Sequence, residues 1–206
     1  MKSVLVKAVL ASSLVASFAC ADGAFVGIET TYDRSSLSEK TTWDGGSQTN
    51  KFKDGQFGLG IKGGYDFGMF RAYAEYIYKF KAKDSIIDED DDTVEVSWKN
   101  HNFLLGGDFT PSLSENFKFL VGAYTGISRL NAKASNPATG ESEKTNDTGW
   151  IIGGKVGGIY EVNQNSEIEF GLKADYTRYK KHSDEEDSWR LTSKNAGLYL
   201  GYNFKF

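Results

Sequence analysis

A strict alternation of apolar and polar residues, repeated in eight segments, is the feature that most limits what this chain can fold into. Successive side chains of an extended strand point to opposite faces, so each segment is expected to be a strand with one apolar and one polar face. The apolar faces hold 43 residues and no Asp, Glu, Lys or Arg, whereas the polar faces hold 40 residues, of which 14 are charged. The expected strands cover residues 24–33, 56–65, 70–80, 102–109, 117–128, 150–162, 167–177 and 195–206.

The connections between these strands indicate which face points outward. Alternation alone does not decide this, because a soluble barrel with an apolar interior alternates in the same way. Here long and short connections follow one another in turn, which is typical of transmembrane β-barrels with long outer loops and short periplasmic turns. The long connections are 34–54, 81–99, 129–148 and 180–194, and the short ones are 66–69, 110–116 and 163–166. The apolar face would then meet lipid, where a charge near the midplane costs about 2–4 kcal/mol.

Aromatic residues are expected at both ends of the lipid-facing band, because transmembrane barrels carry girdles of aromatic side chains at the two membrane interfaces. Several aromatic residues of this chain fall at the ends of the expected strands. The expected girdles comprise Trp98, Trp150 and Trp189 near the long connections, and Tyr65, Phe70 and Tyr160 near the short ones.

Residues 1–21 have the pattern of a secretory signal peptide, with Lys2 and Lys7 before a modest apolar stretch that ends in Ala-Cys-Ala. The stretch is too short for a transmembrane helix, which needs about 20 apolar residues, so we expect cleavage after Ala21 and one mature domain over 22–206. That domain would lose Cys20, the only cysteine. Its net charge would be −6, from 22 Lys and Arg against 28 Asp and Glu, which disfavours nucleic acid as a partner.

The last eight residues, YLGYNFKF, place Gly201, Phe204 and Phe206 in a final alternating strand. With the signal peptide and the eight segments, they resemble the small outer-membrane barrels of the OmpA-transmembrane, OmpX and opacity-protein type. The resemblance implies an all-β, eight-stranded antiparallel up-and-down transmembrane β-barrel in the outer membrane of a Gram-negative bacterium. It implies that these three residues are read by the barrel-assembly machinery, and that outer-membrane lipid and lipopolysaccharide surround the barrel. Unlike OmpA, the chain has no peptidoglycan-binding domain after the barrel, so wall anchoring is not expected.

The polar face would point into the barrel, and its 14 charges divide into seven basic and seven acidic side chains. Eight strands leave an interior barely wide enough for its own side chains. We therefore expect a plug of ion pairs, and a small porin that passes ions or small solutes is the alternative. The expected network in the interior comprises Glu29, Lys62, Arg71, Glu75, Lys155, Glu169, Lys173 and Asp175.

The histidines and their neighbours are the candidates for enzymatic chemistry, because some small outer-membrane barrels modify lipid A with His, Ser and an acidic residue. His182, Ser183 and Asp184 are adjacent and lack the His-x-Ser spacing of the lipid A deacylase family. The pair Asp84 and Ser85 lacks the first-loop histidine that the palmitoyltransferase family needs. A base must reach its nucleophile at hydrogen-bond distance, and these spacings do not predict that, so we expect neither an enzyme nor a cofactor.

Two acidic runs, 88–92 and 184–187, carry the carboxylates that Ca²⁺ and Mg²⁺ prefer as ligands. They lack the glycine and the ligand spacing of an EF-hand loop, and such runs are usually solvated and mutually repelling. The candidate ligands are Asp90, Asp92, Asp184 and Glu186, and the sequence assigns no metal site to them.

The sequence favours a non-enzymatic outer-membrane barrel whose four extracellular loops interact with the surface environment. Host surface molecules, lipopolysaccharide and neighbouring barrels are the expected partners, and adhesion, defence or membrane integrity the expected roles. The small porin is the second hypothesis, and an enzyme that modifies lipid A is the third.

Overall fold

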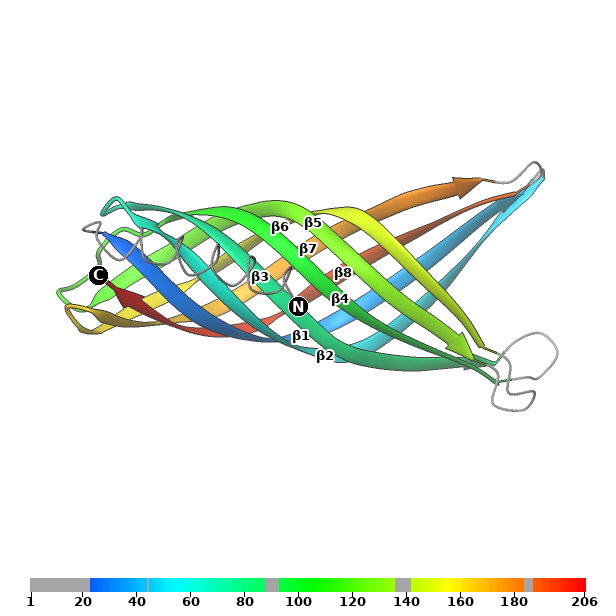
Figure 1. The fold of residues 1–206 in the computed structure, drawn as a ribbon, viewed down its shortest axis with the longest axis horizontal. Helices are drawn as coiled ribbons and strands as arrows, with labels where there is room; N and C mark the ends of the chain where they lie inside the picture. Colours follow the sequence, from blue (N-terminus) through cyan, green and yellow to red (C-terminus); the bar gives the residue numbers. More distant parts are fainter. Residues whose placement is uncertain (1–22, 44, 88–92, 136–141, 184–186) are drawn as a thin grey trace, which may run out of the picture.

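The computed structural model describes residues 23–43, 45–87, 93–135, 142–183 and 187–206. Eight antiparallel strands form a closed barrel in which each strand pairs with its neighbours in the chain and the last pairs with the first (Figure 1). The predicted fold class is therefore confirmed. Within the described residues, no helix is long and apolar enough to cross a membrane. The strands are β1 Ala24–Trp43, β2 Gly46–Asp66, β3 Phe70–Ile87, β4 Thr93–Phe109, β5 Phe117–Ser135, β6 Ser142–Asn163, β7 Ser166–Ser183 and β8 Asp187–Lys205.

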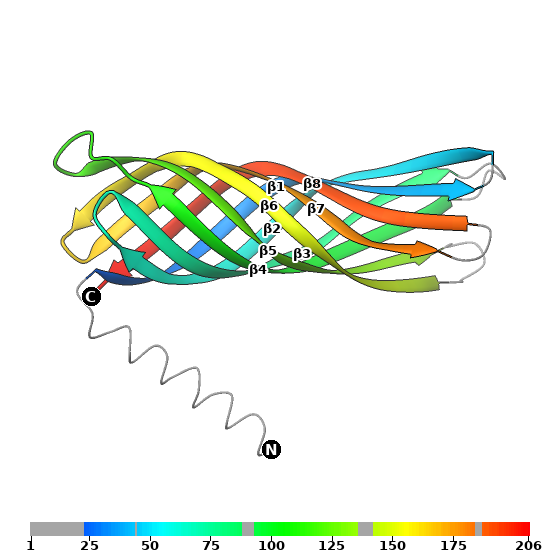
Figure 2. The same ribbon diagram turned by 90° about the horizontal axis from the view of Figure 1, so that it is seen from above.

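The strands are much longer than the alternating segments of the sequence. They contain between 17 and 22 residues, whereas about 9–11 residues suffice for a strand to cross a bilayer. β1 and β2 pair without interruption from Ala24 with Tyr65 to Trp43 with Gly46, so most of the expected loop 34–54 consists of two paired strands. Figure 2 shows the long strands running on to the end of the barrel opposite the C-terminus.

Two sections of the barrel differ in the chemistry of their faces. We call the described residues within 34–54, 81–99, 129–148 and 180–194 the outer extension, and the rest of the barrel the membrane section. In the membrane section, outward residues such as Ile28 and Leu105 are more than half exposed, whereas inward residues such as Glu29 and Lys62 are buried. This is the orientation predicted from the connections, with the apolar face toward lipid.

In the outer extension the apolar and polar faces exchange places. Leu37 and Phe52 point inward and are buried, whereas Arg34, Lys51 and Lys53 point outward and are exposed. An outward apolar face is needed only where lipid surrounds the barrel. The alternation with apolar residues on the outward face, which predicts the strands from the sequence, therefore ends where the two faces exchange. The prediction of long loops in these segments was wrong because the strands continue beyond the point where their outer face meets water.

Candidate functional site: a filled interior

Glu169, on β7, is the centre of an ion-pair network inside the membrane section. Its two carboxylate oxygens lie 2.7 Å from Lys62 Nζ on β2 and 2.9 Å from Lys155 Nζ on β6. Lys155 also lies 2.9 Å from a carboxylate oxygen of Asp108 on β4. None of these four side chains is more than 2% exposed. The network therefore joins four strands across the barrel where water is excluded.

Lys173, on β7, extends this network to two further strands. Its Nζ lies 2.6 Å from Glu29 on β1 and 3.9 Å from Glu75 on β3. Lys62 is 3.6 Å from the other oxygen of Glu29, which links the two halves. A buried ion pair is tolerated only when its partners offset the loss of hydration, and here each lysine has at least two carboxylates. We call these residues the central cluster: Glu29, Lys62, Glu75, Asp108, Lys155, Glu169 and Lys173.

A second group of ion pairs closes the membrane section toward the short turns. Arg71 Nη2 donates to Glu167 and to Asp66, at 2.8 Å in each case. Asn203 Nδ2 donates to Glu167 at 2.9 Å and to Glu169 at 3.2 Å, so this group is continuous with the central cluster. The paired charges thus reach from the middle of the barrel to its turn end.

A third group lies toward the outer extension. Lys79 Nζ is 3.0 Å from Asp33 and 3.5 Å from Asp175. Asn195 Nδ2 donates to the other oxygen of Asp175 at 2.6 Å. The structure therefore brings the eight predicted network residues into the interior, but it distributes them over three groups.

Tyrosine rings fill the space that inward-facing glycines leave free. A Cβ atom at Gly106 would lie 2.3 Å from the ring of Tyr73, and one at Gly153 would lie 2.4 Å from the ring of Tyr124. Lys155 Nζ lies 4.4 Å from the centroid of the Tyr73 ring, a distance at which cation–π attraction operates. The rings therefore occupy the volume between the lysines and the barrel wall.

The interior of the outer extension is apolar rather than charged. Trp98 is only 1% exposed, and its Nε1 donates to Ser35 Oγ at 3.1 Å. At the boundary with the ion pairs, Asn100 donates to the hydroxyl of Tyr179 at 2.8 Å. The extension thus has its own core, which comprises Leu37, Phe52, Ala82, Val96, Trp98, Leu130 and Leu191, and Tyr179 of the membrane section packs with it at the boundary.

Two of the tryptophans expected at the membrane interface lie elsewhere. Trp98 belongs to the core of the outer extension, so its assignment to the lipid interface was wrong. Trp189 is partly buried, packs against that core and stacks on the ring of His182 at 4.2 Å. The alternation explains both positions. Trp98 is an even number of residues from inward-facing Asn102 on β4, and Trp189 is an even number of residues from inward-facing Asn195 on β8, so both tryptophans lie on inward faces.

The other expected girdle residues lie on the outer surface or near it. Trp150 is 61% exposed on β6, and Phe70 and Tyr160 are exposed near the short turns. Tyr65 is partly buried, and its ring lies 4.7 Å from that of Phe67. Their contact with the membrane interfaces stays a prediction.

The candidate catalytic groups are dispersed over the barrel. His182 Nε2 lies 2.7 Å from Asp147, whose side chain is 3% exposed. His101 Nδ1 lies 2.8 Å from the hydroxyl of Tyr76. Asp84 accepts hydrogen bonds from the backbone nitrogens of Lys53, at 2.7 Å, and Ser85, at 2.9 Å, so its carboxylate holds two chain segments together. Among the described residues, neither histidine is hydrogen-bonded to a serine.

The three residues that the resemblance assigns to recognition by the barrel-assembly machinery lie in β8 or directly after it. Gly201 faces the interior, where an added Cβ would lie 3.7 Å from Lys62 Nζ. Phe204 and Phe206 face outward with ring centroids 5.4 Å apart, and the Phe206 nitrogen donates to the carbonyl of Ala24 at 3.0 Å. These residues therefore lie at the end of the last strand, which pairs with β1 to close the barrel. Their recognition by the assembly machinery stays a prediction.

The candidate metal ligands Asp90, Asp92, Asp184 and Glu186 lie outside the described residues. Within the described ranges, there is no group of three or more His, Cys, Asp or Glu side chains that could hold a metal ion.

Some members of the network were missing from the prediction. Asp33 ends the expected strand 24–33, Asp66 directly follows the expected strand 56–65, and Glu167 and Asp108 lie on expected inward faces, but the expected network includes none of them. Extending the inward parity by one step past Thr31 would have found Asp33.

A closed barrel with an apolar outer band and an ion-paired interior defines an integral β-barrel of the outer membrane. A family model described as "Outer membrane protein beta-barrel domain" matches residues 7–204. The chain therefore belongs to this family of outer-membrane β-barrel proteins.

Solved structures have the same fold. Neisserial surface protein A (NspA) is 17% identical with a TM-score of 0.53, and the match covers 89% of this chain and 97% of that chain. The outer-membrane protein OprG from Pseudomonas aeruginosa is 13% identical with a TM-score of 0.54, and the match covers 90% and 97% of the two chains. A search of the curated proteins finds no match.

Proposed function

We propose that this protein is a non-enzymatic outer-membrane barrel that presents its outer extension at the cell surface to other molecules. Host surface molecules are the expected partners, in adhesion, defence or membrane integrity. The observation that carries the proposal is the occupied interior, with ion pairs in the membrane section and an apolar core in the extension. A barrel filled by its own side chains offers its chemistry on its outside and at its outer end.

A small porin is less well supported by this interior. Eight strands leave room for little besides side chains, and a conducting path would have to cross both the central cluster and the core that contains Trp98. Charges that line a water-filled pore are hydrated, whereas the lysines of the central cluster are at most 4% exposed.

An enzyme that modifies lipid A is also less well supported. Acyl transfer or hydrolysis by a serine needs a base within hydrogen-bond distance of the hydroxyl. The two histidines instead contact Asp147 and the Tyr76 hydroxyl, and Asp84 is engaged by backbone nitrogens.

Conductance in planar bilayers tests the filled interior. We expect no single-channel steps from protein purified from outer membranes and shown to be folded by its heat-dependent gel mobility. Reproducible steps that change when Lys62, Arg71 and Glu75 are neutralised would contradict the proposal and favour the porin. Lipid A of altered acylation that depends on His101 or His182 would favour the enzyme.

A shortened hairpin tests whether the outer extension carries the function. Ser38 pairs with Lys51, so replacing 39–50 by Asn-Gly keeps the register and supplies a favoured two-residue turn. We expect cells that produce this variant to lose adherence to host cells or serum resistance while the barrel still folds. Retention of every surface phenotype, also after equivalent shortening of the other three hairpins, would contradict the proposal.

A further inference from the structure

A ring of basic side chains surrounds the barrel where the membrane section meets the outer extension. On each of the eight strands, the first charged outward residue above the apolar band is Lys or Arg, and each of these residues is exposed. On β6 this residue is Lys144, which Thr148 and Asn146 separate from the apolar band, so the ring is drawn from the other seven strands. The residues of this basic ring are Arg34, Lys53, Lys81, Lys99, Arg129, Arg178 and Lys194.

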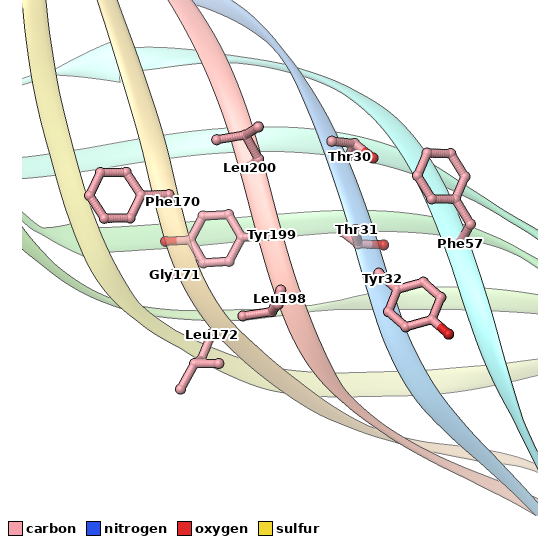
Figure 3. Close-up of a pocket in the computed structure, with 10 residues that line it drawn as sticks. All are labelled: Thr30, Thr31, Tyr32, Phe57, Phe170, Gly171, Leu172, Leu198, Tyr199 and Leu200. Atoms are coloured by element: carbon pink, nitrogen blue, oxygen red, sulfur yellow. The ribbon is translucent and has the colours of Figure 1, made fainter.

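On one side of the barrel, an apolar groove lies directly below the ring. It has a volume of about 410 Å³, which is in the range of ligand sites at about 300–1,000 Å³. Figure 3 shows Phe170 and Leu172 of β7 along one wall, Leu198 and Leu200 of β8 in the middle, and Tyr32 of β1 along the other wall. These residues have the outward parity of the membrane section, so the groove opens toward lipid.

Three members of the basic ring stand above this groove on the same strands. Arg34 follows Tyr32 by two positions on β1 and pairs with Ala196, which makes it a diagonal neighbour of Lys194 on β8. Arg178 on β7 pairs with Thr192 and is therefore also a diagonal neighbour of Lys194. Diagonal neighbours on one face of a sheet are about 7–8 Å apart.

Within the part of the chain that the structure describes, these three cations have no carboxylate partner. No ion pair joins Arg34, Lys194 or Arg178 to an acidic side chain of the described residues, whereas Lys83 on β3 lies 3.0 Å from Glu95. Side chains of like charge at neighbouring positions repel one another. An anion between them would remove this repulsion, and Arg is suited to bind a phosphate group through two hydrogen bonds at once.

We propose that this sector is a binding site for one molecule of lipid A, the phosphorylated and acylated glycolipid of the outer leaflet. Arg34, Lys194 and Arg178 hold its phosphate, and one of its acyl chains lies in the groove over β8. Lipid A meets both requirements because it joins a phosphate to acyl chains at the depth where the ring meets the groove. The site goes beyond the proposed function and does not depend on what the outer extension binds.

Native mass spectrometry tests the site directly. Protein purified from outer membranes in detergent is titrated with diphosphoryl lipid A, and the lipid-bound fraction is measured. The triple variant R34Q, R178Q and K194Q, which removes all three charges, is expected to bind lipid A more weakly by about tenfold or more, because three charge-assisted contacts to phosphate are lost. The matched control removes three charges of the same ring away from the groove, as K81Q, K99Q and R129Q, and is expected to leave binding within about twofold of the unaltered protein.

A second variant tests the groove without changing charge. Replacing Thr30, which lines the groove, by Trp fills it, and is expected to weaken binding of lipid A by about tenfold. Replacing exposed Val121 on β5 by Trp is the control for a larger side chain on the lipid face. Equal losses from both charge variants, or unchanged binding in T30W, would overturn the proposal. So would equal binding of dephosphorylated lipid A, of phosphatidylglycerol, or of a soluble sulfated glycan without acyl chains.

Discussion

Replacement of Glu169 by Gln is the sharpest test of the ion-paired interior. The substitution keeps the size of the side chain but removes the charge that faces Lys62 at 2.7 Å and Lys155 at 2.9 Å. Lys155 keeps Asp108 at 2.9 Å, whereas Lys62 keeps only Glu29 at 3.6 Å. Breaking a buried ion pair by removing one partner costs about 3–5 kcal/mol. Because both lysines retain a carboxylate, we expect a loss of about 3 kcal/mol in the free energy of unfolding.

Urea unfolding of the barrel in lipid vesicles, followed by tryptophan fluorescence, measures this loss. The matched control is Glu95→Gln in the outer extension, which breaks a Lys–Glu pair of similar length, 3.0 Å, whose side chains are 56% and 39% exposed. Exposed pairs contribute about 0–1 kcal/mol, so E95Q should leave the free energy of unfolding nearly unchanged.

The difference between the two variants distinguishes a dry central cluster from a hydrated one. A loss of less than about 1 kcal/mol for E169Q, equal to that of E95Q, would mean that water reaches the central cluster and screens its charges. The interior would then be hydrated and not filled, and this result would contradict the proposed function and favour a small porin.

Three further predictions follow from other parts of the barrel. Gly153→Ala should lower the free energy of unfolding by about 1–3 kcal/mol, because its Cβ would lie 2.4 Å from the Tyr124 ring, whereas outward Gly154→Ala meets its nearest atom at 3.4 Å and should change it little; urea midpoints compare the two. Trp98 fluorescence should resist quenching by brominated lipid and Trp150 fluorescence should be quenched, which single-tryptophan variants measure; equal quenching would refute the core of the outer extension. Burial and the nearby Glu143 raise the pKa of Glu39, so this carboxylate destabilises the fold once it ionises; Glu39→Gln should raise the urea midpoint at about pH 7 but not at about pH 3.5, where the carboxyl is protonated in both states.

The alternation of the sequence predicts the membrane section well because lipid imposes one rule on every outward residue. Ile28, Leu105 and Leu198 follow that rule, and their parity alone puts Glu29 and its partners inside. The outer extension obeys no such rule, since its outer face meets water and its inner face is apolar at Leu37 but polar at Ser35. The prediction for Trp98 was wrong for this reason, because an aromatic residue near the end of a strand indicates an interface position only where lipid surrounds the barrel.

The grouping of the charges could not be predicted from the sequence. Parity assigns Lys62, Lys155 and Glu169 to the interior, but which lysine meets which carboxylate depends on the stagger between strands distant in the chain. Lys173 reaches Glu29, 144 positions away, only because closure of the barrel brings β7 within reach of β1. The groove over β8 depends in the same way on the relative stagger of β7, β8 and β1, which no local sequence pattern predicts.

With the outer extension at the cell surface, as proposed, its paired strands would determine what an antibody or a bacteriophage can recognise. Outward-facing Ser36, Ser38 and Lys40 alternate with inward-facing residues. Any accessible surface patch therefore contains every second residue of β1 together with outward-facing residues of the neighbouring strands β2 and β8. A synthetic peptide of 34–43 would display buried Leu37 beside them and would lack both neighbouring strands. Epitopes on this part of the protein are therefore discontinuous, and substitutions at the outward positions can change them without disturbing the core beneath.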